Sequence, residues 1–586
     1  MVCFGRKQAL VAVVVLAGCS GGDGGGISSG PPPSPPPPPV PAAMISVSDS
    51  TPFEGDGIVL TWSSTGAKSC SATGAWSGSL ETSGSRTEAV RGTGTIVYGL
   101  TCTGDGGSVN AEARIEARER PYFLEVENAL HVVYRDDATA GIIAVPVDVN
   151  SDGRDDVVIH YFGGHFGQTV GDVPCANTMR VFVQQSDNTF SDETSTYLPG
   201  GTDLAGGCSR KRRVTDLNGD GKQDIVYALN REDGRQNASI EDQSTQMGAF
   251  ISSGDHYKLE AFGPSNWYHS ITTGVLPDGR AFAAGAGFGD AVAGPYSFDT
   301  GGNAIPEDVS LPALSPNTAE FASLGDDPGG PSNVLIQTGL YPALLGVEAY
   351  LRDTSGNWNL LGEIDNPYPV VATVDFYTYT GDGPNPVPVH YVGDGRYIVG
   401  AGSGNAISES CRIDLPDRNG AVVVMKMDTS FITDFIPGAT TVVYQGDETH
   451  ESDVTPGLKL FAVEASSNSL EAVPIEIVDE QREVNANFIA CEDVNNDGKS
   501  DITVYPYTVD GRPDVYLGDG TGRFTFIGLS VFPEISEAWG SNVTSLLHDF
   551  DGDGIADLLI WPSTTIYTDL TYRYFKGMKP LEATPS

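Results

Sequence analysis

Residues 148–159 read Asp-Val-Asn-Ser-Asp-Gly-Arg-Asp-Asp-Val-Val-Ile, and this pattern decides the fold. Oxygen-bearing side chains stand at loop positions 1, 3, 5 and 9, glycine stands at position 6, and β-branched residues follow. Oxygens at these positions can converge on one cation, to which position 7 adds its backbone carbonyl. The pattern occurs four times: Asp148, Asn150, Asp152, Arg154 and Asp156; Asp216, Asn218, Asp220, Lys222 and Asp224; Asp493, Asn495, Asp497, Lys499 and Asp501; and Asp549, Asp551, Asp553, Ile555 and Asp557.

All-oxygen ligation is typical of hard cations, so the pattern predicts about four structural Ca²⁺ sites. An EF-hand begins in the same way but needs a bidentate glutamate at position 12. That position holds Ile159, Tyr227, Val504 and Ile560, which excludes an EF-hand. The remaining alternative is a metal-free turn capped by its own Asp and Asn side chains. The recurrence of the same five positions in four copies favours the metal.

Each loop lies between strand-like segments, and a second strand pair follows it. The clearest pair is 514–517 with 523–526; others are 181–183 with 189–190, 249–251 with 257, and 350–351 with 358. This unit predicts a four-stranded propeller blade. Weaker Asp-Gly turns at 276–280, 325–330 and 393–396 keep the turn and lose the ligand set, so we expect them to be metal-free. Seven units then begin near 148, 216, 276, 325, 393, 493 and 549, with an enlarged blade or an insertion between 393 and 493.

The four complete loops and their strands resemble FG-GAP/VCBS repeats, the blades of integrin-α-like β-propellers. The resemblance covers residues 118–586. It implies an all-β, seven-bladed propeller with structural calcium loops between the first two strands of a blade. It also implies that ligands bind through other loops, often on the opposite face, but it carries no ligand-binding residue onto this chain.

Strand-like segments at 122–126 and 131–134 precede the first loop, and the last unit is one strand short of a full blade. An open sheet edge invites unwanted pairing, and closing the ring removes it. We therefore expect residues 121–135 to pair with the blade at 541–578.

Residues 43–117 predict a small β-sandwich. Ile58, Leu60 and Trp62 alternate on one strand, and Ile96, Tyr98, Leu100 and Cys102 alternate on another. The segments Thr61–Ser64, Ser69–Cys70 and Tyr98–Cys102 resemble a bacterial immunoglobulin-like module, which we expect to act as a stalk.

The first 42 residues predict an export signal and a tether. Arg6 and Lys7 precede a nine-residue apolar run, and Leu16-Ala17-Gly18-Cys19 resembles a bacterial lipobox, which implies that residues 1–19 are a lipoprotein leader with Cys19 acylated. Residues 20–42 are rich in glycine and proline, as in a spacer. In the lipoprotein sorting pattern that this segment resembles, Ser20 after the cysteine implies the outer membrane, with the protein facing either the periplasm or the cell surface. We expect membrane contact through the lipid anchor only.

Six cysteines remain outside Cys3 and Cys19, and they allow 15 pairings. Sequence order favours Cys70 with Cys102, Cys175 with Cys208, and Cys411 with Cys491. Such bridges fit an exported protein.

Composition and motifs limit the function. The chain carries 77 acidic against 33 basic residues, so nucleic acid is not an expected partner. It lacks His-Glu-x-x-His, a phosphate-binding Gly-x-x-x-x-Gly-Lys and Cys-x-x-Cys. We expect a monomeric, non-enzymatic adhesion protein with a protein or glycan ligand. The alternative is a polysaccharide lyase or hydrolase, which needs a deep central pocket holding His, Lys, Tyr or Arg beside carboxylates.

Overall fold

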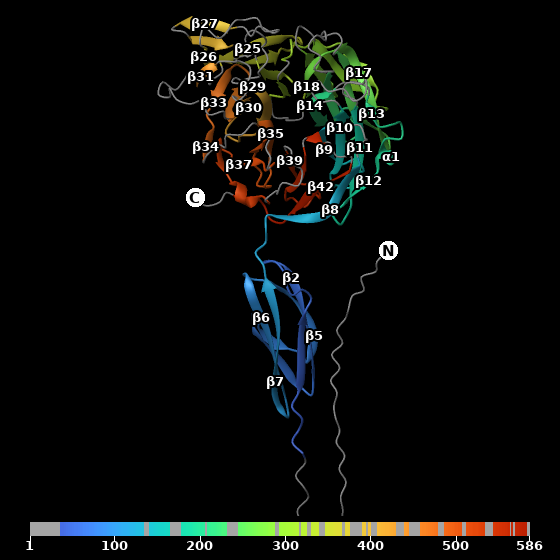
Figure 1. The fold of residues 1–586 in the computed structure, drawn as a ribbon, viewed down its shortest axis with the longest axis vertical. Coiled ribbons are helices and arrows are strands. Elements are labelled where there is room, and N and C mark those ends of the chain that lie inside the picture. The colour runs from blue at the N-terminus through green and yellow to red at the C-terminus, as the bar shows by residue number, and fades with distance from the viewer. Residues whose placement is uncertain are drawn as a thin grey trace, which may run out of the picture. The chain divides into compact units, whose positions relative to one another are not determined.

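The computed structural model contains two compact units, residues 1–120 and 121–586, and nearly all of its regular structure is β-strand (Figure 1). It describes residues 36–582 with gaps at 134–139, 164–176, 205–207, 231–243, 288–291, 316–317, 325–329, 339–345, 366–369, 375–388, 394–395, 400–406, 429–438, 445–457, 479–485, 507–510, 534–542, 563 and 566–568. The lipobox and Cys19 lie outside these residues. Within them, no helix is long and apolar enough to cross a membrane.

The first unit packs two antiparallel sheets around one core. One sheet has the order β1 (Ala42–Val47), β2 (Gly57–Thr65), β5 (Ser83–Ala89); the other has β4 (Gly78–Leu80), β3 (Ser69–Gly74), β6 (Gly94–Gly104), β7 (Gly107–Ala117). Trp62 of β2, Trp76 and Tyr98 of β6 meet edge to face at the centre. The alternation expected for β2 is present, with Ile58, Leu60 and Trp62 buried. On β6, Tyr98, Leu100 and Cys102 are buried and Ile96 is half-buried.

The disulfide between Cys70 and Cys102 is confirmed. The two residues are directly opposite each other on β3 and β6, with Cα atoms 4.1 Å apart and both side chains in the core. The bridge therefore joins neighbouring strands of one sheet. In the chain-entropy model a loop of this length contributes about 3–4 kcal/mol.

The described residues of the second unit form eight small sheets, each named after one of its strands. The β9 sheet contains β9 (Ala140–Val147), β10 (Asp156–Gly163), β11 (Asn177–Gln184), β12 (Phe190–Asp192), β13 (Asp203–Leu204) and β41 (Thr564–Thr565), and a short helix α1 (Thr194–Tyr197) follows β12. The β14 sheet contains β14 (Cys208–Thr215), β15 (Asp224–Asn230), β16 (Thr245–Ser253) and β17 (His256–Asn266). The β18 sheet contains β18 (Tyr268–Val275), β19 (Ala281–Gly287), β20 (Val292–Phe298) and β21 (Ala304–Pro306). The β22 sheet contains β22 (Ala319–Ala322), β23 (Val334–Thr338), β24 (Gly346–Arg352) and β25 (Trp358–Asp365).

The remaining sheets come from the C-terminal half of the chain. The β26 sheet contains β26 (Val370–Val374), β27 (Val389–Gly393), β28 (Arg396–Val399) and β31 (Ala439–Tyr444). The β29 sheet contains β29 (Ile407–Ile413), β30 (Ala421–Asp428), β32 (Leu458–Ala465) and β33 (Leu470–Val473). The β35 sheet contains β34 (Glu476–Val478), β35 (Ala486–Glu492), β36 (Asp501–Pro506), β37 (Asp514–Gly518) and β38 (Arg523–Phe526), followed by a 3₁₀ turn η1 (Leu529–Val531). The β39 sheet contains β39 (Val543–His548), β40 (Asp557–Pro562), β42 (Asp569–Gly577) and β8 (Phe123–Val133).

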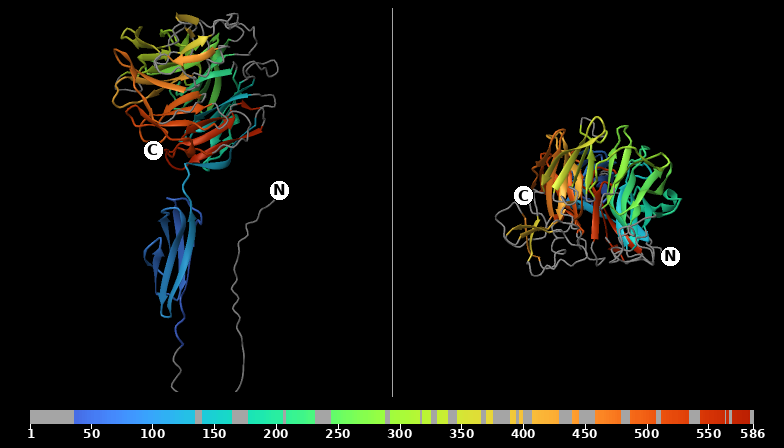
Figure 2. Two further views of the ribbon diagram at one scale, coloured as in Figure 1. Left: turned by 60° about the vertical axis from the view of Figure 1, so that its left-hand side comes forward. Right: turned by 90° about the horizontal axis from the view of Figure 1, so that it is seen from above.

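The order of strands within the sheets agrees with the repeat unit expected from the sequence. Each complete Asp loop connects two neighbouring strands of one sheet: β9 to β10, β14 to β15, β35 to β36 and β39 to β40. The four predicted second pairs are present as hairpins: β37–β38, β11–β12, β16–β17 and β24–β25. Figure 2 shows the sheets of the second unit following one another in chain order, from cyan through green and orange to red.

Seven of these sheets pack face to face in succession. Separate apolar cores lie between the β9 and β14 sheets, the β14 and β18 sheets, the β18 and β22 sheets, the β22 and β29 sheets, the β29 and β35 sheets, the β35 and β39 sheets, and finally the β39 and β9 sheets. The arrangement is propeller-like, and the last sheet packs against the first.

The expected pairing between the two ends of this unit is confirmed. Strand β8 is antiparallel to β42, with Gly577 opposite Phe123 and Asp569 opposite Val133. The reverse link also exists, because β41, which follows β40, pairs with β9. Each end of the unit thus contributes a strand to a sheet built mainly by the other end.

The unit expected to begin near residue 393 does not supply the fifth sheet of the succession. Its Asp-Gly turn, 394–395, lies outside the described residues, and the strands on either side of it, β27 and β28, pair in the β26 sheet. The β22 sheet instead shares a core directly with the β29 sheet. The place in the succession belongs to the β29 sheet, whose loop is Asp414–Gly420 and whose strand β30 begins with five buried residues, Ala421–Met425. An Asp-Gly turn marks any hairpin, whereas a continuous buried run marks a strand covered on both faces.

The disulfide between Cys411 and Cys491 is also confirmed, and it joins β29 to β35 with Cα atoms 5.5 Å apart. The expected pair Cys175 and Cys208 includes Cys175, which lies outside the described residues. The two observed bridges fit an extracellular or otherwise oxidising compartment.

Closure through β8 predicts a large loss of stability on truncation of its buried face. Leu130 is fully buried between the first and last sheets, so Leu130→Ala should cost about 2–5 kcal/mol and lower the melting temperature. Leu124→Ala, on the same strand but 42% exposed, should change it little. Equal melting temperatures for the two variants would show that β8 adds little to the unit.

Candidate metal loops

The aspartate at position 9 is the most buried of the expected ligands in each complete loop. Asp156, Asp224, Asp501 and Asp557 are all 0% exposed. One carboxyl oxygen accepts the backbone N–H of loop position 2: Val149 at 3.0 Å, Leu217 at 2.8 Å, Val494 at 2.9 Å and Phe550 at 3.1 Å. The other oxygen accepts an N–H at the end of the third strand: Gln184 at 2.8 Å, Ser252 at 2.7 Å, Gly518 at 2.8 Å and Gly577 at 2.7 Å. Position 9 thus fastens the loop to its own sheet.

The outer positions organise the loop backbone. In the first loop, the Asp148 carboxylate accepts the N–H groups of Asp152 at 3.2 Å and Gly153 at 3.0 Å, and Asn150 Oδ1 also accepts from Asp152 at 2.8 Å. The glycine at position 6 has φ between 82° and 86° in all four loops, which explains why glycine is required there. These bonds hold the oxygens of positions 1, 3 and 5 around one turn.

The hydrogen bonds within each loop do not fully compensate the negative charge of the buried aspartate. Burial raises the pKa of Asp156 to about 7; the bonds from Gln184 and Val149 act against this rise, and the charges of Asp148 and Asp152 add to it. Burial likewise raises the pKa of Asp501 and Asp557 to about 7 and that of Asp224 to about 6. A cation among these oxygens would stabilise the ionised forms, so the donor set fits a hard divalent ion.

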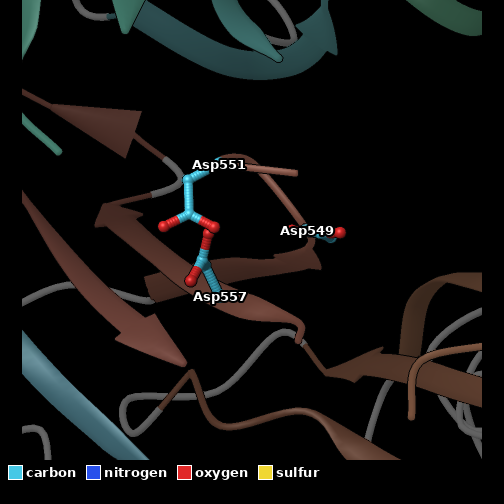
Figure 3. A group of neighbouring side chains, drawn as sticks. All are labelled: Asp549, Asp551 and Asp557. Atoms are coloured by element: carbon cyan, nitrogen blue, oxygen red, sulfur yellow. The ribbon is translucent and has the colours of Figure 1, made fainter. Parts of the chain in front are cut away.

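The fourth loop brings three carboxylates closest together. One oxygen each of Asp549, Asp551 and Asp557 lies within 4.8 Å of the others, and Figure 3 shows Asp551 and Asp557 directed toward one another. Tyr574 donates a 2.7 Å hydrogen bond to Asp557 Oδ2. Lys576 of β42 bonds Asp551 and lies 2.8 Å from Asp553 Oδ2. An ammonium group therefore already contacts two of the expected ligands.

The other three loops carry their basic residue at position 7. Arg154 pairs with Asp152, and Lys499 Nζ lies 3.3 Å from Asp497 Oδ2, whereas Lys222 donates to the carbonyl of Gly254 at 2.8 Å. In the fourth loop position 7 is Ile555, and Lys576 from a different strand supplies the positive charge.

Ring closure brings loops from opposite ends of the sequence into contact. The N–H of Asp155 donates to the carbonyl of Phe550 at 2.7 Å, and Asp155 also bonds His548. A Cβ on Gly552 would lie 2.5 Å from the carbonyl oxygen of Gly153, so only glycine fits there. Burial alone would lower the pKa of His548, but its bond to Asp155 raises it overall.

The second loop joins the same series through Tyr257. Its side chain is buried in the core between the β9 and β14 sheets, where burial raises the pKa of the phenol and the charges of Asp224, Asp220, Asp148 and Asp156 raise it further. The four complete loops therefore belong to four successive sheets, those of β35, β39, β9 and β14.

The structure keeps every sequence-predicted ligand within its own loop. Sequence reasoning missed Lys576 and Tyr574, which come from β42; the isoleucine at position 7 was the one available signal. The weaker turn at 276–280 is held differently, since Arg280 bonds Asp278 at 2.7 Å and also pairs with Glu307. The weaker turn at 325–330 lies largely outside the described residues.

Comparison with known proteins supports the repeats. A family model for an FG-GAP-like repeat matches residues 148–227 and 493–560, which contain all four complete loops. No curated protein matches the sequence. Similar solved structures include AofleA from Arthrobotrys oligospora, at 8% identity and a TM-score of 0.34 over 79% of this chain and 93% of that one. A putative phosphatase from Bacteroides thetaiotaomicron aligns at 9% identity and a TM-score of 0.28 over 78% and 94%. Alignments at this level assign no activity to this chain.

The two roles of the loop aspartates predict separable effects. Asp224→Asn replaces one acceptor by an amide donor facing a backbone N–H, so it should cost about 1–3 kcal/mol with or without calcium. Asp220→Asn keeps an oxygen for the N–H of Lys222. It should therefore lower the melting temperature only when calcium is present. Thermal unfolding in calcium and in chelator measures both, and a purely calcium-dependent loss in Asp224→Asn would contradict the fastening role.

Lys576 predicts that the fourth loop binds calcium most weakly. Lys576→Met removes the competing ammonium and should tighten calcium binding at that loop about tenfold, equivalent to roughly 1.4 kcal/mol. It should also lower the melting temperature in chelator, because Asp551 and Asp553 then repel each other. Lys499→Met is the matched control, since that lysine makes one 3.3 Å contact. Calorimetric titration distinguishes the two, and equal affinity changes would refute the prediction.

Proposed function

We propose that this protein is a lipid-anchored, extracytoplasmic, calcium-stabilised β-propeller that acts as a non-enzymatic adhesion or ligand-binding protein. The observation that carries the proposal is the continuous series of four complete loops on successive sheets of a propeller-like unit with FG-GAP-like repeats. Such a unit has loops at both ends of its sheets. The side chains of the complete Asp loops already make hydrogen bonds within their own sheets, so other loops would bind the ligand.

The seven sheets that pack in succession are the blades in this proposal. The β26 sheet is an insertion into the β29 blade, because β26–β28 precede β29 and β31 lies between β30 and β32 in the chain. The two-sheet unit at 43–117 is an immunoglobulin-like stalk, and the core around Trp62 and the bridge Cys70–Cys102 support an independently stable module.

Calcium has a structural role in this proposal. Positions 1, 3, 5 and 9 would supply side-chain oxygens to the ion and position 7 its backbone carbonyl, and the buried carboxylate at position 9 would also balance its charge. Four divalent ions would offset eight of the 44 net negative charges. Extracellular modules bind calcium with dissociation constants of about 0.1–1 mM, so about 1 mM calcium would add roughly 2–6 kcal/mol over four independent sites.

Chelation should therefore destabilise one unit selectively. In chelator, the 121–586 unit should melt at a lower temperature and be cleaved faster by protease, while the 43–117 unit should be unaffected. Asp152→Ala and Asp497→Ala should each reproduce part of the loss. A melting temperature that chelator leaves unchanged would refute calcium stabilisation.

The anchor and the ligand-binding role share one experiment. Wild-type protein should fractionate with membranes, and the Cys19→Ser variant should be released in soluble form. The soluble variant can then be applied to glycan and protein arrays with and without calcium. Saturable binding without product formation supports the proposal. Release of unsaturated or shortened oligosaccharides would favour a lyase or hydrolase, and membrane association of Cys19→Ser with normal cleavage would refute the anchor.

A further inference from the structure

We propose that the first and fourth metal loops bind calcium cooperatively, because buried hydrogen bonds through Gln184 and Tyr574 join the position 9 aspartates of the two loops. This coupling deepens the proposed structural role of calcium and rests on it. It would make the junction at which the ring closes respond to the surrounding calcium concentration as one unit.

A continuous set of hydrogen bonds runs from one aspartate to the other. The backbone N–H of Gln184 donates to Asp156 Oδ1 at 2.8 Å. The side-chain Nε2 of the same residue donates to the hydroxyl oxygen of Tyr574 at 3.3 Å, and that hydroxyl donates to Asp557 Oδ2 at 2.7 Å. None of these four residues is more than 1% exposed, so water does not compete for the bonds. The path therefore crosses the junction between the β9 and β39 sheets within the core.

The donor and acceptor roles along this path are fixed. An ionised Asp557 can only accept, so the Tyr574 proton serves that carboxylate and the phenol oxygen accepts from Gln184. The second N–H of the Gln184 amide donates to Asn188 Oδ1 at 3.3 Å. Gln184 Oε1 is buried and accepts no hydrogen bond from the described residues. A buried acceptor without a donor is destabilising, so stability alone does not explain an amide at this position.

The other complete loops lack the residues that this path needs. In each loop, position 9 accepts the N–H of one residue on the third strand, and Tyr574 stands three residues before that residue on β42. The equivalents of Tyr574 are Val181, Ala249 and Val515, and those of Gln184 are Ser252, Gly518 and Gly577. Valine and alanine side chains form no hydrogen bond. The path therefore belongs to the closing junction.

Backbone contacts hold the two loops together, so the ends of the path stay within bonding distance. The Asp155 N–H donates to the carbonyl of Phe550 at 2.7 Å, and the Phe550 N–H donates to Asp557 at 3.1 Å. Once a bound cation fixes Asp156, Gln184 is fixed as well, and its amide holds the Tyr574 hydroxyl. The fourth loop then loses less conformational entropy when it binds its own ion, which is positive cooperativity. Buried hydrogen bonds in series also strengthen one another.

Repulsion between two bound divalent ions acts in the opposite direction. Salt screens this repulsion, with a Debye length of about 8 Å at physiological ionic strength and about 3 Å at 1 M. Buried hydrogen bonds are screened much less. The cooperativity should therefore increase with salt concentration, and about 1 M potassium chloride is the condition in which the path dominates.

Calorimetric calcium titration of full-length variants in this salt tests the coupling. Asp220→Ala with Asp497→Ala disables the second and third loops and leaves the pair. Adding Asp152→Ala or Asp553→Ala leaves a single loop. The overall constant for two ions on the pair, divided by the product of the two single-loop constants, is the coupling factor. We expect about fivefold, the low end for coupled sites, because one bond of the path is long.

Three further variants of these proteins test the path itself. Gln184→Met keeps the backbone N–H that serves Asp156 and removes the side-chain donor, so the factor should fall to about one. Its melting temperature in chelator should be equal or higher, because an unsatisfied oxygen is removed. Tyr574→Phe keeps the ring and should also give about one. Tyr505→Phe is the matched control, since this buried hydroxyl accepts the N–H of Leu547 at 3.1 Å between the β35 and β39 sheets and should leave the factor unchanged.

The outcomes separate this coupling from the calcium role on which it rests. A factor of about one in the unmodified pair, or a factor that Gln184→Met leaves unchanged, would overturn the coupling while calcium binding persists. An equal loss in Tyr505→Phe would overturn the path through Gln184. Absence of calcium binding by the wild type and by every single-loop variant would overturn the proposed structural role of calcium as well.

Discussion

The second unit depends on one repeated interaction, a buried aspartate that accepts two backbone N–H groups. In each complete loop the position 9 carboxylate joins the start of the loop to the end of the third strand. Hydrogen bonds to a charged acceptor contribute about 1.5–3 kcal/mol each, but burying the charge costs a comparable amount. The two hydrogen bonds therefore fix the geometry of the carboxylate but do not neutralise its negative charge. A cation bound nearby would neutralise that charge and so stabilise the whole sheet.

Ring closure converts four separate loops into one continuous feature. Two lie near residue 150–220 and two near 490–560, and pairing of β8 with β42 brings the β39 and β9 sheets together. Asp155, Phe550 and Gly552 then make direct contacts between loops. Negative charge from the loop aspartates therefore accumulates along this series of sheets.

Much of this organisation was accessible from the sequence. The loop positions and the four-stranded unit follow from local spacing, and the closing strand follows from the cost of an open sheet edge. The two observed disulfides agree with pairing in sequence order. The fifth unit was misplaced because Asp394-Gly395 resembles any hairpin turn, and the buried run at Ala421–Met425 was the better signal. Lys576 comes from a different strand than the loop it contacts, and Gln184 and Tyr574 lie 390 residues apart in the chain, so local spacing contains no information about either contact.

The most direct test of the central claim is a crystal structure of the full chain in millimolar calcium, with anomalous diffraction used to locate the ions. We expect peaks within the loops that begin at Asp148, Asp216 and Asp493, and a weaker peak at Asp549, where Lys576 competes. Each peak should lie among the side-chain oxygens of positions 1, 3 and 5. Four loops without any peak, in a structure whose buried aspartates keep both backbone bonds, would show that these are metal-free turns and would contradict the account.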